Sequence, residues 1–380
     1  MRKTLGEHAA KHTAGHVERC AWAGYAVVAP VFATVSDVGP HRVWGWVAGA
    51  GYAVAAFLTP GSGPRRAARA VAVLGAAVVP LVCLVAAGLG QLEVAVVERS
   101  GRLLLTTGNP YVPAPTAVAD FNPYLPGMAL FGMLPGDPRW WLGGAFVAAL
   151  AGAGLHRAPL LACPLVALPL AVGGTDLPVA GLMCLGVSLA GRGRPGRAGL
   201  ALGAAAALKW TAWPALPVAL ALIAVRRGRR PALRCVAVGV STATAAVLPF
   251  ALAAPSAFHR NVVAFPLGLT ATASPAASPL PGRLLASHVP GGAVIALVLL
   301  SVGALLLALS LALRPPGTVR AAGARLALGL GLATALMPAT RFGYLVCPLV
   351  LGALAYQPAG RGTADIPPVP SVPSEKAAIA

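Results

Sequence analysis

Long apolar stretches separated by short polar joints run through most of this chain, from about residue 21 to residue 356. A helix that crosses a bilayer needs roughly 20 apolar residues, because every backbone polar group must be paired inside the hydrocarbon. The pattern predicts an all-α polytopic membrane protein with about twelve crossings. The predicted spans are 20–36, 43–59, 70–90, 140–155, 159–174, 177–190, 198–208, 212–225, 235–253, 291–313, 326–340 and 345–357.

Composition supports this class. Apolar residues make up 57% of the chain and charged residues 10%, and the mean hydropathy is +0.77. No water-soluble domain has such a composition. The net charge of +19 does not indicate nucleic-acid binding, because the excess basic residues lie in short joints rather than on a soluble face. Membrane lipids are therefore expected partners, and nucleic acid is not.

Charged side chains are sorted between alternate joints. Five joints contain arginine and no acid, and cytoplasmic loops retain Lys and Arg, so these joints are predicted to be cytoplasmic. Their arginines are Arg65, Arg66, Arg69, Arg157, Arg192, Arg194, Arg197, Arg226, Arg227, Arg229, Arg230, Arg234, Arg314, Arg320 and Arg325. The other joints hold every mid-chain acid: Asp37, Glu93, Glu98, Asp120, Asp137 and Asp176. An even number of crossings then predicts a multi-pass plasma-membrane protein with both termini in the cytoplasm.

Three regions follow from this topology. Residues 1–19 are predicted to be a cytoplasmic segment that precedes an uncleaved signal anchor, because no small-residue cleavage site follows the first apolar run. Residues 20–357 form the integral-membrane domain. Residues 358–380 contain Pro, Ser, Lys and Glu with little apolar content, and they are predicted to be a disordered cytoplasmic tail.

One stretch is too short for two ordinary spans. Arg197 and Arg226 are both predicted to be cytoplasmic, yet only about 28 residues separate them. Lys209, Trp210 and Pro214 interrupt the apolar run at its middle. We expect a broken helix pair whose tip carries Lys209 to the outer level, since such breaks are tolerated inside a bundle.

The longest outer segment is residues 91–139, and loops of this length are usually functional. Residues 92–105 are predicted to form an amphipathic helix at the bilayer surface. A turn at 108–111 and a Pro-rich run follow, which we expect to place Asp120, Asn122 and Tyr124 around a pocket. The alternative for Asp120 is a solvated loop carboxylate.

Two acids of the outer joints have specific interpretations. Glu93 lies beside apolar Leu92 and Val94 at a membrane boundary, where a carboxylate can bind protons more tightly and act as a general base. The alternative is a carboxylate that simply faces water. Asp176 precedes Pro178 and is predicted to cap the following span, with substrate contact as the alternative.

Several motifs resemble a known family. Glu93-Val-Ala-Val-Val97 and Gly108-Asn-Pro-Tyr111 look like the first extracytoplasmic loop of the GT-C glycosyltransferases, in particular glycosyltransferase family 87. The resemblance continues downstream and covers roughly residues 70–345. Its further motifs are Asp176-Leu-Pro178, Arg192-Gly-Arg-Pro195, Ala207-Leu-Lys-Trp-Thr-Ala-Trp-Pro214 and Phe258-His-Arg-Asn-Val-Val-Ala-Phe-Pro-Leu-Gly268. In that family the loop opens with Asp-x-x-x-Tyr, so Glu93 replaces the Asp and Val97 replaces the aromatic residue.

The resemblance implies a GT-C-like bundle with residues 91–139 as an extracytoplasmic catalytic loop after the third span. It implies an enzyme of cell-envelope biosynthesis that moves a hexose, with mannose favoured, from a polyprenyl-phosphate donor to a lipid or glycan acceptor. Glu93 would be the catalytic base, and Asp120 is the alternative carboxylate. The expected substrate-binding residues are Lys209, His259, Arg260, Arg341, Asn122, Tyr124 and Asp176.

Among these residues, the positively charged side chains are suited to bind the phosphate that leaves when the sugar is transferred. Lys209, Arg260 with His259, and Arg341 lie at outer span ends, where fixed positive charge stabilises a departing phosphate. The alternatives are snorkelling for Lys209 and ordinary headgroup contact for the arginines. No metal site is predicted, and a divalent cation stays open as a cofactor.

Two other functions remain as alternatives. A polytopic transporter or lipid flippase would also have a discontinuous helix pair, although such proteins place ionisable residues near the midplane. A family member that has lost catalysis and serves as a scaffold is the second alternative, because Val97 departs from the family pattern.

Overall fold

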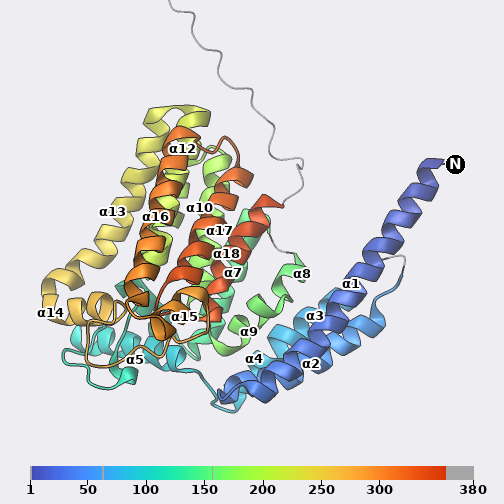
Figure 1. The fold of residues 1–380 in the computed structure, drawn as a ribbon, viewed down its shortest axis with the longest axis horizontal. Helices are drawn as coiled ribbons and strands as arrows, with labels where there is room; N and C mark the ends of the chain where they lie inside the picture. Colours follow the sequence, from blue (N-terminus) through green and yellow to red (C-terminus); the bar gives the residue numbers. More distant parts are fainter. Residues whose placement is uncertain (1, 62–63, 156, 357–380) are drawn as a thin grey trace, which may run out of the picture.

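The computed structural model describes residues 2–61, 64–155 and 157–356 (Figure 1). Helices form almost all of the regular structure, and no strand occurs within these ranges. An isolated parallel bridge pairs Ala277 with Thr340. The predicted all-α class is therefore confirmed, whereas the predicted tail at 358–380 lies outside the described residues.

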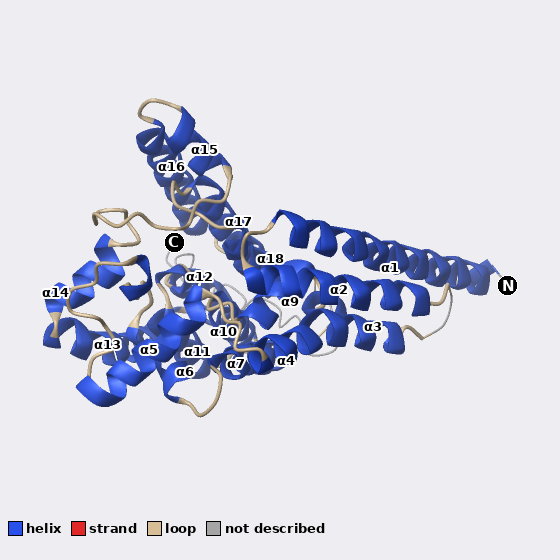
Figure 2. Cartoon of the chain, turned by 90° about the horizontal axis from the view of Figure 1, so that it is seen from below, coloured by secondary structure: helices blue, strands red, loops and turns tan. Residues whose placement is uncertain are grey.

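The amino-terminal helices form an elongated group that projects from one side of the molecule (Figure 2). They are α1 (Arg2–Val35), α2 (Gly39–Leu58), α3 (Arg66–Val73), the π-turn η1 (Leu74–Val78) and α4 (Val79–Ala86). Pro80 explains the π-turn, because it has no N–H to donate to the carbonyl of Ala76. The indole Nε1 of Trp44 donates to that carbonyl instead, at 2.8 Å, and so ties α2 to η1.

The remaining long helices form a bundle in which α10 is the central element. Its members are α7 (Pro138–Ala153), α10 (Asp176–Gly191), α11 (Pro195–Leu208), α12 (Ala215–Arg227), α13 (Arg229–Ala253), α16 (Gly292–Leu313), α17 (Val319–Leu336) and α18 (Val346–Ala355). The shorter α8 (Ala158–Leu161) and α9 (Pro164–Val172) connect the bundle to the first group. Nearly every residue of α10 is buried. Small residues permit this packing, since a Cβ on Gly186 would lie 2.5 Å from the side chain of Leu202.

Short helices gather at one end of the bundle, at the bottom of Figure 1. They include α5 (Leu92–Thr107), α6 (Ala129–Met133), α14 (Pro255–Phe258), the π-turn η5 (His259–Ala264) and α15 (Pro281–His288). The predicted helix at 92–105 is confirmed as α5, which is terminated by Gly108 directly after Thr107, with a φ of 73°. α5 crosses α6 closely, because a Cβ on Gly132 would collide with the carbonyl of Val97.

Four described segments are long and apolar enough to cross a membrane: Arg66–Ala86, Arg229–Ala253, Gly292–Leu313 and Val319–Leu336. They support a membrane location, and the full set of about twelve crossings stays a prediction. Some helices begin before the spans predicted for them, and one of these is α13, which begins at Arg229 instead of residue 235. We predicted a span from residue 326, but α17 begins at Val319, because the hydroxyl of Thr318 accepts the N–H of Ala321 at 3.1 Å and starts the helix earlier.

The predicted broken helix pair is confirmed. α11 ends at Leu208, Lys209 is extended, the 3-10 turn η4 spans Trp210–Ala212, and α12 begins at Ala215. Lys209 therefore lies at the tip of two short helices. The turn between α12 and α13, which is rich in arginine, lies at the upper end of Figure 1, opposite α5, α14 and α15. The orientation of these two ends relative to a membrane stays a prediction.

Candidate active site

Two ion pairs between residues far apart in the sequence lie at the end of the bundle that carries α5. Glu93 pairs directly with Arg341, although 248 positions separate them in the sequence. Lys209 pairs with Asp176, with 2.8 Å between Nζ and Oδ1. Each of these four side chains is at most about one-third exposed, from 13% for Asp176 and Lys209 to 31% for Arg341. Two acidic and two basic side chains thus lie near the surface of the protein, where they are largely shielded from solvent.

Two tyrosines join the ion pairs into one group. The ammonium of Lys209 lies 5.1 Å from the ring centroid of Tyr124 and 5.7 Å from that of Tyr344. All four charged side chains lie within electrostatic reach of Tyr344. We call Glu93, Asp176, Lys209, Arg341, Tyr124 and Tyr344 the polar cluster.

The cluster forms because the ends of several elements meet there. Glu93 and Asp176 lie in the first turns of α5 and α10, where the helix dipole favours negative charge. Lys209 follows the last residue of α11. Arg341 precedes η6, the 3-10 turn at Phe342–Leu345. The backbone is no longer held in a regular helix beyond these ends, so the polar side chains there can point toward a common centre.

The loop at 108–128 covers this end of α11. The N–H of Leu125 donates to the carbonyl of Leu208 at 3.0 Å. A Cβ on Gly127 would lie 2.8 Å from the carbonyl of Ala207, so glycine lets the loop approach the helix end. These contacts place the ring of Tyr124 beside Lys209. Burial raises the pKa of the Tyr124 hydroxyl, which stays protonated near neutral pH.

Buried amides hold the loop in place. The side-chain oxygen of Asn261 in η5 accepts the N–H of Asn122 at 2.8 Å, and its amide nitrogen donates to the carbonyls of Val112 and Ala257. The amide of Asn122 donates to Pro110 and accepts the N–H of Tyr124. Both Asn122 and Asn261 are fully buried. Asn122 thus shapes the loop that presents Tyr124.

Replacing Asn261 by leucine should loosen this loop. The N–H of Asn122 and the carbonyl of Val112 would lose their partners, which we expect to destabilise the fold by about 2–4 kcal/mol. The check is thermal unfolding in detergent together with protease nicking between residues 108 and 127. Ser256→Ala, at an exposed position of the neighbouring α14, is the matched control. A loop as resistant to protease as the parent's would contradict this role.

Besides Asn122, three expected site residues lie outside the polar cluster. The carboxylate of Asp120 accepts the backbone N–H groups of Ala117 and Thr116 and closes the 3-10 turn η2 (Val118–Asp120), which lowers its pKa. His259 and Arg260 are exposed. Arg260 reaches the loop through one contact to the carbonyl of Pro113, at 3.4 Å.

Asp176 does not have the predicted capping role. The N-cap of α10 is Thr175, which makes no capping hydrogen bond with its side chain. The carboxylate of Asp176 binds Lys209 instead. The sequence rule failed because a buried cation 33 positions away competes successfully for the carboxylate.

Three neighbours of the site were not selected from the sequence. Tyr344 lies three residues after Arg341, and Asn261 directly follows Arg260, so proximity to each arginine was the available signal. His41 of α2 lies near both Glu93 and Arg341 and contacts Gln91. Burial lowers the pKa of His41, so the imidazole is neutral near neutral pH.

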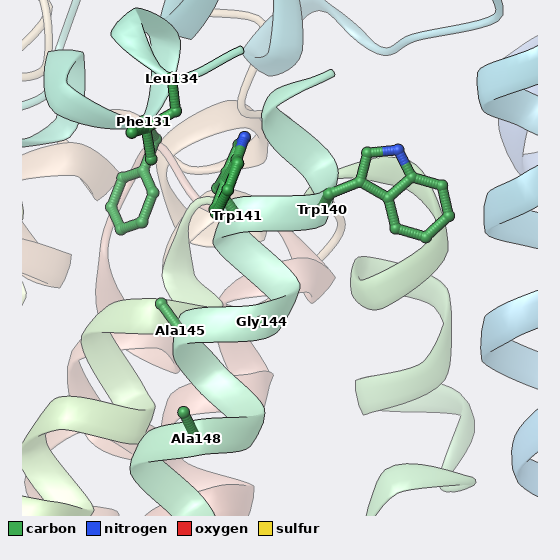
Figure 3. A pocket seen from close by; sticks show the side chains of 7 residues that line it. All are labelled: Phe131, Leu134, Trp140, Trp141, Gly144, Ala145 and Ala148. Carbon is green, nitrogen blue, oxygen red and sulfur yellow. The ribbon is translucent and has the colours of Figure 1, made fainter. Parts of the chain in front are cut away.

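An apolar groove of about 480 Å³ lies between α6 and α7 (Figure 3). It is lined by Phe131, Leu134, Trp140, Trp141, Gly144, Ala145 and Ala148. The ring of Phe131 lies beside that of Trp141, whereas the ring of Trp140 extends to the other side of α7 (Figure 3). No charged side chain lines the groove, so the candidate chemistry lies in the polar cluster.

A comparison with known proteins tests the family resemblance that was inferred from the sequence. The family model described as Glycosyltransferase family 87 matches residues 153–340. The resemblance to glycosyltransferase family 87 is confirmed over this stretch, whereas its extension to residues 70–152, which contain the Glu93 and Gly108 motifs, stays a prediction. No curated protein and no solved structure matches the chain.

The family 87 match and the long apolar helices indicate a membrane glycosyltransferase, whose substrates are a sugar donor and an acceptor. The matched stretch contains Asp176 and Lys209. Glu93 and Tyr124 precede it, and Arg341 directly follows it. The structure therefore brings residues inside and outside the matched stretch into one cluster.

Proposed function

We propose that this chain transfers a hexose, in the first instance mannose, from a polyprenyl-phosphate donor to a lipid or glycan acceptor at the extracytoplasmic face. The observation that supports this reaction is the meeting of a carboxylate, Glu93, with two cations, Arg341 and Lys209, at one end of an apolar bundle. Transfer from a lipid phosphate needs a base for the acceptor and cations for the phosphate, and the polar cluster contains both.

In this mechanism Glu93 removes the proton from the acceptor hydroxyl. The hydroxyl oxygen attacks the anomeric carbon while the bond from that carbon to the phosphate oxygen breaks, so the sugar is transferred with inversion. A single carboxylate suffices, because no covalent sugar–enzyme intermediate forms. Asp120 is the alternative base, although its carboxylate holds the η2 turn.

The departing phosphate gains negative charge, which Lys209 and Arg341 stabilise. An ammonium has three donors, so Lys209 can bind phosphate while keeping Asp176 as its partner, and the five donors of a guanidinium allow Arg341 to bind phosphate as well. Binding of the phosphate beside Arg341 would also draw the guanidinium away from Glu93 and free the base. His259 and Arg260, exposed on η5, contact the substrate from the rim, and Asn122, Tyr124 and Asp176 shape the site.

The test is transfer by the purified full chain in liposomes. The donor is a polyprenyl phosphate with a radiolabelled mannose, and the acceptors come from a lipid extract of cell envelopes. We expect label to move from the donor to a new product in the presence of the protein. Movement of intact donor across the bilayer without a change in its sugar would instead support the transporter alternative.

A further inference from the structure

The environment of Lys209 limits how its ammonium can be oriented. The residue lies between two short helices, in extended conformation, and its four-carbon side chain is flexible. Asp176 is the only hydrogen-bond acceptor for this ammonium among the described residues. The rings of Tyr124 and Tyr344 lie within 6 Å of it, at 5.1 and 5.7 Å. Two of the three N–H donors therefore remain for a ligand.

Asp176 has a fixed position. It lies in the first turn of α10, the buried central helix. Its carboxylate bonds to Lys209, and its backbone carbonyl lies 4.0 Å from the Sγ of Cys347 in α18. A carboxylate on such a rigid element can orient a flexible lysine, and its negative charge would repel a phosphate if it faced the ligand itself.

We propose that Asp176 is a positioning residue, which acts on the lipid phosphate only through Lys209 by holding its ammonium charged and oriented toward the ligand. This inference rests on the proposed function and deepens it, because it separates the residue that binds phosphate from the residue that orients it. Preorganised cations stabilise developing charge without reorganising during the reaction.

The charge state of Lys209 supports the same role. The groups that face the ammonium are Asp176 from α10, Tyr124 from the loop, Tyr344 from η6 and Cys347 from α18. Burial alone would lower the pKa of Lys209, but the charge and hydrogen bond of Asp176 act together with Tyr124 and Tyr344 to outweigh burial, so the pKa lies above its ordinary value. Without that carboxylate, Lys209 loses the main cause of the increase, and its pKa falls. Its positive charge is then lost at a lower pH.

Three variants test this dependence: Asp176→Asn, Lys209→Met and the double variant. The readout is the dissociation constant of polyprenyl phosphate, which contains no sugar and needs no turnover. We expect each single variant to weaken binding about tenfold or more, since each impairs the same charge-assisted contact. The double variant should bind no more weakly than Lys209→Met. The double variant has no charge at either position, so neither residue is left as an unpaired buried charge. It therefore controls for misfolding of the single variants.

The pH dependence gives a second readout. Binding by Asp176→Asn should weaken as the pH rises through the alkaline range in which the parent still binds. In the background Asp176→Asn, the further change Lys209→Arg should remove this pH dependence, because a guanidinium stays charged. If the effects of the single variants multiply in the double variant, Asp176 acts independently of Lys209 and the inference is overturned. A parent that binds polyprenyl phosphate but transfers no sugar would refute the proposed function alone.

Discussion

Glu93→Gln should reduce sugar transfer by about 10²–10⁴-fold, the range lost when a general base is removed. Glutamine has the size of glutamate and still accepts a hydrogen bond from Arg341, so the geometry of the polar cluster is kept. It cannot take the acceptor proton. Initial rates of label transfer from polyprenyl-phosphate mannose are the measurement, and binding of the donor should stay within a few-fold of the parent value.

Glu98→Gln is the matched control for this variant. Glu98 lies on the same helix, α5, but is exposed and forms no ion pair in the described part of the chain. It should transfer sugar at the parent rate. Undiminished transfer by Glu93→Gln would exclude Glu93 as the base and direct attention to Asp120.

Arg341→Gln should lower transfer by about 10²–10³-fold, the loss typical of removing one group that stabilises transition-state charge. Arg341 is about one-third exposed and shares its guanidinium with Glu93, so it can contact the phosphate of a lipid that approaches from the membrane surface. We expect both a lower kcat and a higher KM for the donor. Steady-state kinetics with labelled donor at several concentrations measure the two effects separately.

The control for Arg341 is Arg102→Gln, an exposed arginine on α5. Loss of the Arg102 charge tests whether any cation at this end of the protein can replace Arg341 in phosphate binding. We expect Arg102→Gln to keep the kcat and KM of the parent. Faster transfer by Arg341→Gln would contradict phosphate binding. It would mean that Arg341 only neutralises Glu93 and holds the base inactive.

The helical class was predictable because the apolar run of a membrane helix can be recognised from the local sequence alone. Apolar runs predicted the all-α class, and the Lys209–Pro214 interruption predicted the broken pair α11–α12. Helix starts were less predictable. The first turns of α17 contain Arg320 and Arg325, so hydropathy alone placed them in a joint, whereas the capping hydroxyl of Thr318 begins the helix before them.

The candidate site was predictable only as a set of residues on one side. Position in the predicted outer loops selected Glu93, Lys209, Arg341 and Tyr124, which belong to the polar cluster, but it also selected Asp120, His259 and Arg260, which lie apart from it. Their partners were not predictable, because the pairing of Glu93 with Arg341 depends on tertiary packing across 248 positions. Asp176 was misassigned for the same reason: local rules describe a helix cap, and only the fold brings Lys209 to it.

The short pair α11–α12 also has a consequence for the surrounding lipid. Their 14 and 13 residues extend only about 21 and 20 Å at 1.5 Å per residue, whereas ordinary bilayer hydrocarbon is about 30 Å thick. In the proposed orientation, a flat leaflet would bury the tip that carries Lys209. We therefore expect the leaflet to thin around this end of the bundle, so that the carrier's headgroup meets the enzyme in a local depression of the membrane. Transfer rates should then depend on the acyl-chain length of the host lipids.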